Sequence, residues 1–517
     1  MPRGEKLLKV WNSWGSGIGY LRDDGRTPGL YYASGIIGSV NELRAAPFVN
    51  TVDISGVNAT TDNIATYFFD ENTSATQSYI YAVMNRVSAA TGAIIKIRTD
   101  NANFATVLES TASAASRLSR PARYQDNWYL AGSDLGRKLT TIAAGVGDTW
   151  TTGAGAAGGH FTMLNHQLSQ ATTSSGVRIL AEDAAPLTGT WGAYFGVGDK
   201  SEIPADLFGI QGMVFVLKRS GLYSFGVKND RTVSGMILED FGRWRGAFRN
   251  IPSTLWKSGA VIPHPAGLLY YAPGETYIPI GIETKPELGG IPPSGVTELQ
   301  IGRYHGVAAV GDYLYTIYQP DPNATGALLL CGNAPGGSPS DIAWQAISSV
   351  TLKNATSTEA VHGLYGTAVG FPEGANETNP TLWFSDAAGG TTHLSYVILD
   401  SRGQPLRTRA NTHRIVTSGN AWMPVLALDE PTKLARIVVY TDDMASGDEW
   451  QLSIVADDTG SDINVGAPII GSGRHERLIQ RHTTYQLVLH VKFTGISTAS
   501  RVPPSIKRIE LWAAESQ

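Results

Sequence analysis

Residues 212–227 read GMVFVLKRSGLYSFGV, an apolar run, a polar turn and a second strand-forming run. This pattern predicts a β-hairpin, and because Met213–Leu217 is apolar on both faces, its first strand is expected to pack between layers of a core. Two later stretches, Gly267–Ile282 (GLLYYAPGETYIPIGI) and Arg303–Tyr318 (RYHGVAAVGDYLYTIY), have the same design. Their spacing of about 40 to 55 residues is in the range of propeller blades.

A similar rhythm of short strands and turns runs from Thr61 to about residue 405. We therefore expect residues 61–405 to form an irregular β-propeller of about five to seven blades. Residues 144–176 are rich in Gly, Ala, Thr and Ser, which predicts a long loop or a poorly ordered insertion.

The pattern of apolar and polar residues changes at both ends of the chain. In Glu449–Ala456 and Thr484–Phe493, apolar and polar residues alternate strictly, which is typical of an antiparallel sheet with one solvated face. Residues 406–517 are thus predicted to be a β-sandwich. Residues 1–60 are aromatic and glycine-rich without periodicity, and we expect an extended arm that closes on or docks to the propeller, or lies on a neighbouring subunit. The predicted fold class is all-β.

Composition excludes several kinds of protein. The net charge of −5 argues against a general nucleic-acid coat, and the single cysteine, Cys331, excludes an intrachain disulfide or a cysteine-based zinc site. The sequence contains no run of 18 apolar residues, so it predicts no membrane-spanning helix. The N-terminus lacks the apolar core of a secretory signal. Charged residues are only 16% of the chain, which suits surface hidden in an assembly or a Ser/Thr/Asn-rich surface equally.

Three constellations resemble catalytic or metal sites but fail on spacing. His475-Glu476 is followed by His482, seven positions on, whereas a helical zinc pair needs i and i+4. The acidic cluster Asp457, Asp458 and Asp462 lacks the spacing of a calcium loop. Residues 147–150 (GDTW) match only the last half of a sialidase Asp-box. We therefore predict no catalytic residue, no metal site, no cofactor and a non-enzymatic role.

The most basic and aromatic stretch is FGRWRGAFR, residues 241–249. Its arginines either extend to solvent from a strand between blades, or contact another subunit, or bind nucleic acid or glycan. The residues proposed for a subunit or partner contact include two tryptophans of the arm: Arg243, Trp244, Arg245, Phe248, Arg249, Trp11 and Trp14.

The two ends of the chain resemble structural proteins of tailed-bacteriophage virions. The resemblance lies in WNSWGSGIGYLRDDGRTPGLYYASGI, residues 11–36, and in TYQLVLHVKF and PPSIKRIELWAA, residues 484–493 and 503–514. It implies a structural tail or neck component, made in the host cytoplasm and located in the virion. Its partners would be copies of itself in a symmetric ring and other tail proteins, with no specific nucleic-acid binding. A glycan-binding receptor module of the tail and, third, a polysaccharide hydrolase remain as alternatives.

Overall fold

The computed structural model describes most of the chain and is nearly all β. Two short 3₁₀ turns, η1 (Ala154–Ala156) and η3 (Pro339–Asp341), are the only helical elements among the described residues. The described residues are 5–19, 29–47, 49–53, 63–74, 77–86, 91–98, 107–143, 147–164, 166–171, 176–198, 201–218, 221–227, 233–240, 253–264, 267–273, 277–282, 302–321, 323–352, 364–366, 381–387, 393–400, 402–405, 415–457, 462–479, 483–496 and 502–514.

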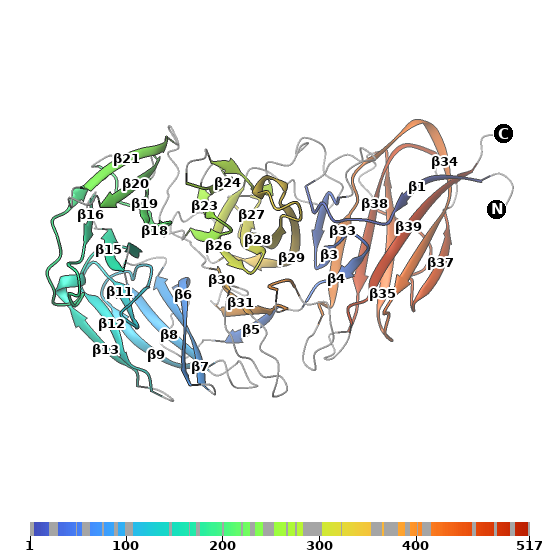
Figure 1. Ribbon diagram of the computed structural model, residues 1–517. Helices are drawn as coiled ribbons and strands as arrows, with labels where there is room; N and C mark the ends of the chain where they lie inside the picture. The colour runs from blue at the N-terminus through green and yellow to red at the C-terminus, as the bar shows by residue number, and fades with distance from the viewer. Residues whose placement is uncertain are drawn as a thin grey trace.

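Seven four-stranded antiparallel sheets in the described ranges form the blades of a β-propeller, with one larger domain beside it (Figure 1). The first strand of a blade lies against the first strand of the next in five of the seven neighbouring pairs, which places these strands innermost. Blades 1 to 3 consist of β6 (Asn63–Ser74), β7 (Gln77–Arg86), β8 (Gly92–Arg98) and β9 (Val107–Ala114); β10 (Ala122–Tyr124), β11 (Asn127–Ala131), β12 (Gly136–Thr141) and β13 (Thr149–Gly153); and β14 (Phe161–Leu164), β15 (Gln167–Ala171), β16 (Gly176–Ile179) and β17 (Phe195–Gly196). Blades 4 and 5 consist of β18 (Asp206–Ile210), β19 (Met213–Lys218), β20 (Gly221–Val227) and β21 (Val233–Asp240); and β22 (Thr254–Trp256), β23 (Gly259–His264), β24 (Gly267–Tyr271) and β25 (Ile278–Pro279). Blades 6 and 7 consist of β26 (Arg303–Val310), β27 (Tyr313–Gln319), β28 (Gly326–Asn333) and β29 (Ala343–Thr351); and β30 (Leu364–Gly366), β31 (Thr381–Asp386), β32 (His393–Ile398) and β5 (Asn50–Asp53).

Blade 7 combines three late strands with one early strand. Strand β5 pairs antiparallel with β32, from Tyr396↔Asn50 to His393↔Asp53. The ring is thus closed by hydrogen bonds between segments more than 300 residues apart in the sequence. Such closure shortens the free sheet edges that would otherwise pair with other chains.

The second domain is a sandwich of two sheets that share one long strand. Strand β34 pairs with β38 through its first half (Leu426↔Leu487 to Lys433↔Thr483) and with β39 through its second half (Leu434↔Ala513 to Asp442↔Ser505). The buried tryptophan Trp450 lies between the sheets. The eleven strands are β1 (Glu5–Trp11), β2 (Tyr32–Ser34), β3 (Ile36–Gly38), β4 (Leu43–Ala45), β33 (Ser418–Trp422), β34 (Leu426–Asp442), β35 (Glu449–Ala456), β36 (Ile463–Asn464), β37 (Gly473–Leu478), β38 (Thr483–Thr494) and β39 (Ser505–Ala514).

The N-terminal segment forms part of this sandwich rather than an arm without sheet structure. Strand β1 pairs with β39, β2 with β33, and β4 with both β3 and β39. The same segment also docks on the propeller, because the Ile18 N–H donates to the Trp344 carbonyl of blade 6 at 2.7 Å. Residues expected to form one arm, 1–60, therefore contribute strands to two domains.

The three hairpins that resemble one another in sequence occupy different places in their blades. Residues 212–227 supply the second and third strands of blade 4, residues 267–282 the third and fourth of blade 5, and residues 303–318 the first and second of blade 6. The expectation that Met213–Leu217 packs between layers of a core agrees with its burial on both faces, since every residue after Met213 is buried. The hairpins are alike because interior strands share an apolar pattern, and they are not units of a strict repeat.

The prediction of a long loop or insertion at residues 144–176 is wrong for the part the structure describes. That part carries β13, η1, β14 and β15, which belong to blades 2 and 3. The small residues permit close packing rather than disorder: a Cβ on Gly136 would lie 2.3 Å from the Ala156 Cβ. Glycine and alanine here let strand β12 and turn η1 approach one another.

Candidate functional sites

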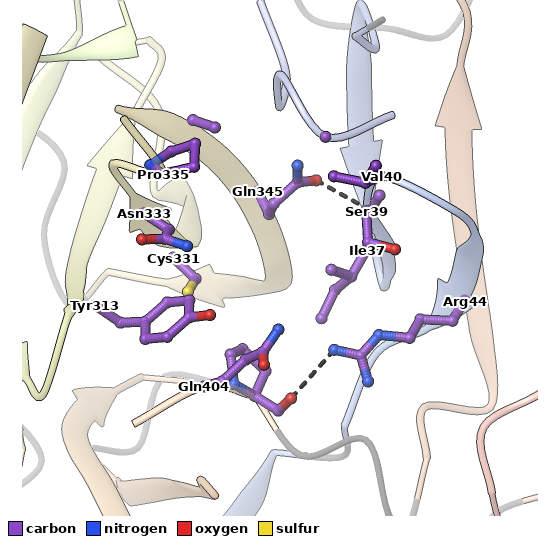
Figure 2. Close-up of a pocket in the computed structure, with 14 residues that line it drawn as sticks. Ile37, Ser39, Val40, Arg44, Tyr313, Cys331, Asn333, Pro335, Gln345 and Gln404 are labelled. Atoms are coloured by element: carbon purple, nitrogen blue, oxygen red, sulfur yellow. Dashed lines mark hydrogen bonds between the residues drawn. The ribbon is translucent and has the colours of Figure 1, made fainter. Parts of the chain in front are cut away.

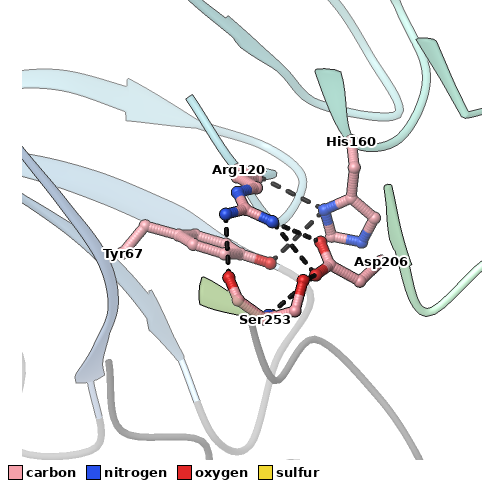
Figure 3. A network of polar contacts seen from close by, with 5 residues as sticks. All are labelled: Tyr67, Arg120, His160, Asp206 and Ser253. Carbon is pink, nitrogen blue, oxygen red and sulfur yellow. Dashed lines mark hydrogen bonds and ion pairs between the residues drawn. The ribbon is translucent and has the colours of Figure 1, made fainter. Parts of the chain in front are cut away.

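A buried polar network connects five blades (Figure 3). Arg120 and His160 lie just before the innermost strands β10 and β14, Asp206 begins β18, and Ser253 immediately precedes β22. Tyr67 joins them from β6, the innermost strand of blade 1. Because successive blades repeat the same geometry, residues at the start of each innermost strand converge near the centre of the propeller.

The Asp206 carboxylate is the centre of this network. Both of its oxygens accept from Arg120 Nη1 at 3.0 Å. Its Oδ2 also accepts from the Ser253 backbone N–H at 2.8 Å and from Ser253 Oγ at 2.5 Å. Arg120 Nη2 donates to the Ser253 carbonyl at 2.9 Å. Arg120, Asp206 and Ser253 are therefore hydrogen-bonded to one another.

His160 and Tyr67 complete the network from the other side. His160 Nδ1 lies 3.4 Å from both the Tyr67 hydroxyl and the Arg120 backbone N–H, and both side chains are buried. Burial, and then the negative charge of Asp206, raise the pKa of Tyr67 well above its usual range, so the phenol stays protonated. Since Ser253 Oγ donates to Asp206 rather than to a histidine, the geometry is that of an inter-blade brace and not of an activated nucleophile.

A second buried ion pair joins blades 1 and 2. Lys96 Nζ on β8 lies 2.7 Å from Asp148 Oδ1, in the loop before β13, and both side chains are fully buried. Asp148 also accepts from the Tyr81 hydroxyl at 2.7 Å and the Ala143 N–H at 2.8 Å. Asp148 is the aspartate of the half-matched Asp-box, so its position has a structural explanation in the contact between blades.

A cavity of about 150 Å³ lies between the N-terminal segment and blade 6 (Figure 2). On one side, Gln345 accepts from the Gly38 N–H at 3.0 Å and donates to the Trp14 carbonyl at 3.4 Å. On the other, Arg44 donates to the Pro405 carbonyl at 3.1 Å. These polar groups already serve the contact between the segment and the propeller.

Cys331 also lines this cavity and is buried. Burial raises the pKa of its thiol to about 12, so it is protonated at neutral pH and a poor nucleophile. In this environment Cys331 behaves as a small buried apolar residue.

The structure places the two candidate contact tryptophans inside the chain. Trp14 has no exposed surface and its Nε1 lies 3.3 Å from the Met423 sulfur, while Trp11 is 6% exposed. Both belong to the core shared by the sandwich and the propeller, which removes them from any contact surface. The other candidates, Arg243, Trp244, Arg245, Phe248 and Arg249, lie outside the described residues.

The rejected metal-like motifs have structural partners where they are described. Glu476 pairs with Arg436 at 2.8 Å, and Asp457 accepts from Thr484 Oγ1 at 2.7 Å and from two N–H groups of β38. Asp462 lies 2.7 Å from Lys492 Nζ and 3.0 Å from His490 Nδ1. His482 and Asp458 lie outside the described residues.

Sequence reasoning did not find the network around Asp206. The available signal was positional: Arg120, His160, Asp206 and Ser253 each come at or just before the first strand of a blade. This signal can be recognised only if the first residue of every blade is known. The hairpins in the sequence do not mark the first strand, because they occupy different positions in their blades.

Comparison with known proteins gives distant structural likenesses only. No family model and no curated protein matches the chain. A streptogramin B lyase structure is 11% identical and covers 68% of this chain and 98% of its own, with a TM-score of 0.41. Virginiamycin B lyase from Staphylococcus aureus is 9% identical and covers 64% of this chain and 98% of its own, with a TM-score of 0.36. Exo-beta-1,3-galactanase from Phanerochaete chrysosporium with galactose is 8% identical and covers 90% of this chain and 100% of its own, with a TM-score of 0.27. Likenesses this distant carry no argument about the activity or ligands of this chain.

Within the described residues, no helix has the length and apolar character needed to cross a membrane.

Proposed function

We propose that this protein is a non-enzymatic structural component of a bacteriophage tail or neck, present as a ring of identical copies. The observation that carries the proposal is the meeting of the two ends that resemble virion proteins. Trp11 pairs with Ile509, and Ala33 and Ile36 share one apolar core with Leu487 and Ile509. The similar segments thus lie in one module, as an attachment unit built from both ends of the chain would require.

The joining of that module to the propeller supports the same role. One apolar core contains Trp14 of the N-terminal segment, Trp344 of blade 6 and Trp450 of the sandwich. A component of an external particle must transmit load between its domains, and a shared core does so better than a flexible linker. The closed ring of blades also leaves only short, protected sheet edges, which limits nonspecific pairing.

Two measurements test this proposal. Mass spectrometry of purified particles from the phage that encodes the chain is expected to detect it, and absence from the particle would overturn the proposal. Light scattering and electron microscopy of the recombinant chain are expected to show a closed ring, alone or with neighbouring tail proteins. A chain that stays monomeric with every tail protein offered would contradict ring formation.

Binding of a host-surface glycan is a second candidate function. The observation that favours it is an exposed tyrosine, Tyr194, whose ring lies beside the guanidinium of Arg178 at the outer edge of blade 3. A receptor module and a structural ring component are compatible roles for one tail protein.

A further inference from the structure

Three side chains form a row on one face of blade 3. Gln170 on β15 is the cross-strand partner of Arg178 on β16. The pairing Val177↔Phe195 between β16 and β17 then places Arg178 opposite Tyr194, which precedes Phe195. Directly opposed residues of antiparallel strands point to the same face. The row ends at the outer edge of the blade, where Tyr194 is exposed.

The Arg178 guanidinium is held in a fixed orientation by neutral acceptors. Nε donates to Gln170 Oε1 at 2.9 Å, and Nη2 donates to the carbonyls of Gly155 at 2.9 Å and Ala157 at 3.0 Å. Among the described residues, no carboxylate lies within ion-pair distance of Arg178. Burial lowers the pKa of Arg178, but an arginine remains charged at neutral pH. A positive charge with a fixed orientation is therefore left without a counter-ion in the described part of the chain.

Two aromatic rings flank this guanidinium. Its central carbon lies 4.5 Å from the centre of the Trp191 ring and 5.3 Å from that of Tyr194. Trp191 is fixed by its Nε1 bond to the Pro186 carbonyl at 3.0 Å and by stacking on Phe161. Tyr194 is 58% exposed, a high value for an aromatic side chain. We call Arg178, Trp191 and Tyr194 the Arg178 platform.

The acidic residues of the neighbouring loop act elsewhere. After burial itself, the charges of Asp183 and Glu182 raise the pKa of Tyr124 in blade 2. Neither charge is among the causes that shift the pKa of Arg178, which are burial and then Tyr194. Strand β16 also lies at the end of the molecule opposite the sandwich that holds both chain ends (Figure 1). The platform is distal to the proposed attachment module.

We propose that the Arg178 platform binds an acidic sugar, a uronic-acid residue of a surface polysaccharide. The C–H face of the sugar ring would pack on Tyr194, as apolar faces pack on aromatic rings. The sugar carboxylate would accept from Nη1 of Arg178, the nitrogen not used by the acceptors above, in a charge-assisted hydrogen bond. This inference specifies the second candidate function and does not depend on the tail proposal.

Titration calorimetry of the full chain with an oligogalacturonate tests the assignment, with the neutral galactose oligomer as control ligand. We expect binding of the acidic oligomer and at least about tenfold weaker binding of the neutral one, because charge-assisted hydrogen bonds contribute strongly. Arg178→Gln is expected to weaken acidic-oligomer binding about tenfold or more, and Arg178→Lys by less, because lysine keeps the charge. Tyr194→Ala is expected to weaken it about fivefold, and Tyr194→Phe hardly at all, since the ring face makes the contact.

Tyr485→Ala is the matched control, because Tyr485 is 62% exposed on the sandwich and has no arginine over its ring among the described contacts. It is expected to bind like the wild type. Thermal unfolding of each variant separates loss of fold from loss of binding, and Tyr194→Ala, at an exposed position, is expected to keep the wild-type midpoint. Absence of binding, equal affinity for the neutral oligomer, or unchanged binding by Arg178→Gln would overturn the proposal. Polyglutamate that competes as well as the sugar would also overturn it, in favour of an acidic protein partner. None of these results changes whether the chain is found in particles.

Discussion

The two most deeply buried ion pairs of the propeller lie between blades, whereas the ion pairs of Arg436 lie on one face of a sandwich sheet. Lys96–Asp148 and Arg120–Asp206 connect different blades, and three of these four side chains are at most 1% exposed. In the sandwich, Arg436 joins Glu5 and Glu476 across three strands of one sheet, with Glu476 37% exposed. Ion pairs of the same kind therefore lie in a low-dielectric interior in the propeller and near solvent in the sandwich.

The difference follows from how each domain is built. The sandwich strands are tied by long ladders, such as the pairing of β34 with β39, and by a core that includes Trp450. Within the described residues, no strand of one blade pairs with a strand of the next, so apolar and polar side-chain contacts between blades fix their relative positions. Loss of one partner of a buried ion pair lowers the free energy of unfolding strongly, whereas an exposed ion pair contributes little to that free energy.

Removing Lys96 is expected to have the largest effect. Lys96→Met leaves Asp148 buried without its cation, and we expect the free energy of unfolding to fall by about 3 to 5 kcal/mol. Urea unfolding followed by tryptophan fluorescence measures the change. Lys96→Met combined with Asp148→Asn removes the uncompensated charge and is expected to recover a substantial part of the loss. A single variant as stable as the wild type would show that water reaches Asp148.

Asp206 is expected to come second. Asp206→Ala leaves the Ser253 donors and Arg120 without their shared acceptor, which we expect to lower the unfolding free energy by about 2 to 4 kcal/mol. Arg120 is 25% exposed and can turn towards solvent, so the loss is expected to be smaller than for Lys96. Ser253→Ala, which removes one hydroxyl only, serves as the milder control. Equal losses from Asp206→Ala and Ser253→Ala would contradict the central role of the carboxylate.

Two buried histidines, one in each domain, predict acid sensitivity. Burial lowers the pKa of His264 on β23 and of His490 on β38 to about 4. An unfolded histidine titrates near about 6.5, so between roughly pH 6.5 and 4 the unfolded state takes up protons that the folded state does not. Stability is therefore complete above pH ~6.5 and falls as the pH decreases through this window.

The effect is expected to be clearer for His264. For His490, Asp462 at 3.0 Å opposes the shift, whereas burial is the only cause for His264. We expect His264 to contribute about 2 to 3 kcal/mol to the loss between pH 7 and 4. Urea midpoints across this range are expected to fall less steeply for His264→Gln than for the wild type. Parallel pH profiles would contradict the assignment.

The sequence was sufficient to predict the strands with the strongest alternation. The strands at 449–456 and 484–493 were predicted and are present as β35 and β38. They were predictable because apolar residues recur at every second position, although Ser453 and His490 on the opposite faces are also buried, so those faces are not solvated throughout.

What the sequence did not predict depends on contacts between distant segments. The closing strand β5 has only four residues, and its partner β32 lies more than 300 positions later. Asp206 and Lys96 show no local pattern that marks them as buried, because their partners come from other blades. Trp11 and Trp14 were predicted to contact a subunit or partner, but the structure places both in the chain's own core.

The smallest effect is expected on the outer face of the sandwich. In Glu476→Gln, Arg436 keeps its contact with Glu5 at 2.8 Å and its position over the Trp512 ring at 4.8 Å. Because Glu476 is 37% exposed, water replaces the lost ion pair, and we expect a change within about 1 kcal/mol that diminishes further in high salt. Thermal unfolding at low and high salt measures it, beside the buried-pair variant Lys96→Met, whose loss should be much less affected by salt. A large, salt-independent loss in Glu476→Gln would mean that the outer pairs of the sandwich are shielded from solvent, and the contrast between the two domains would then disappear.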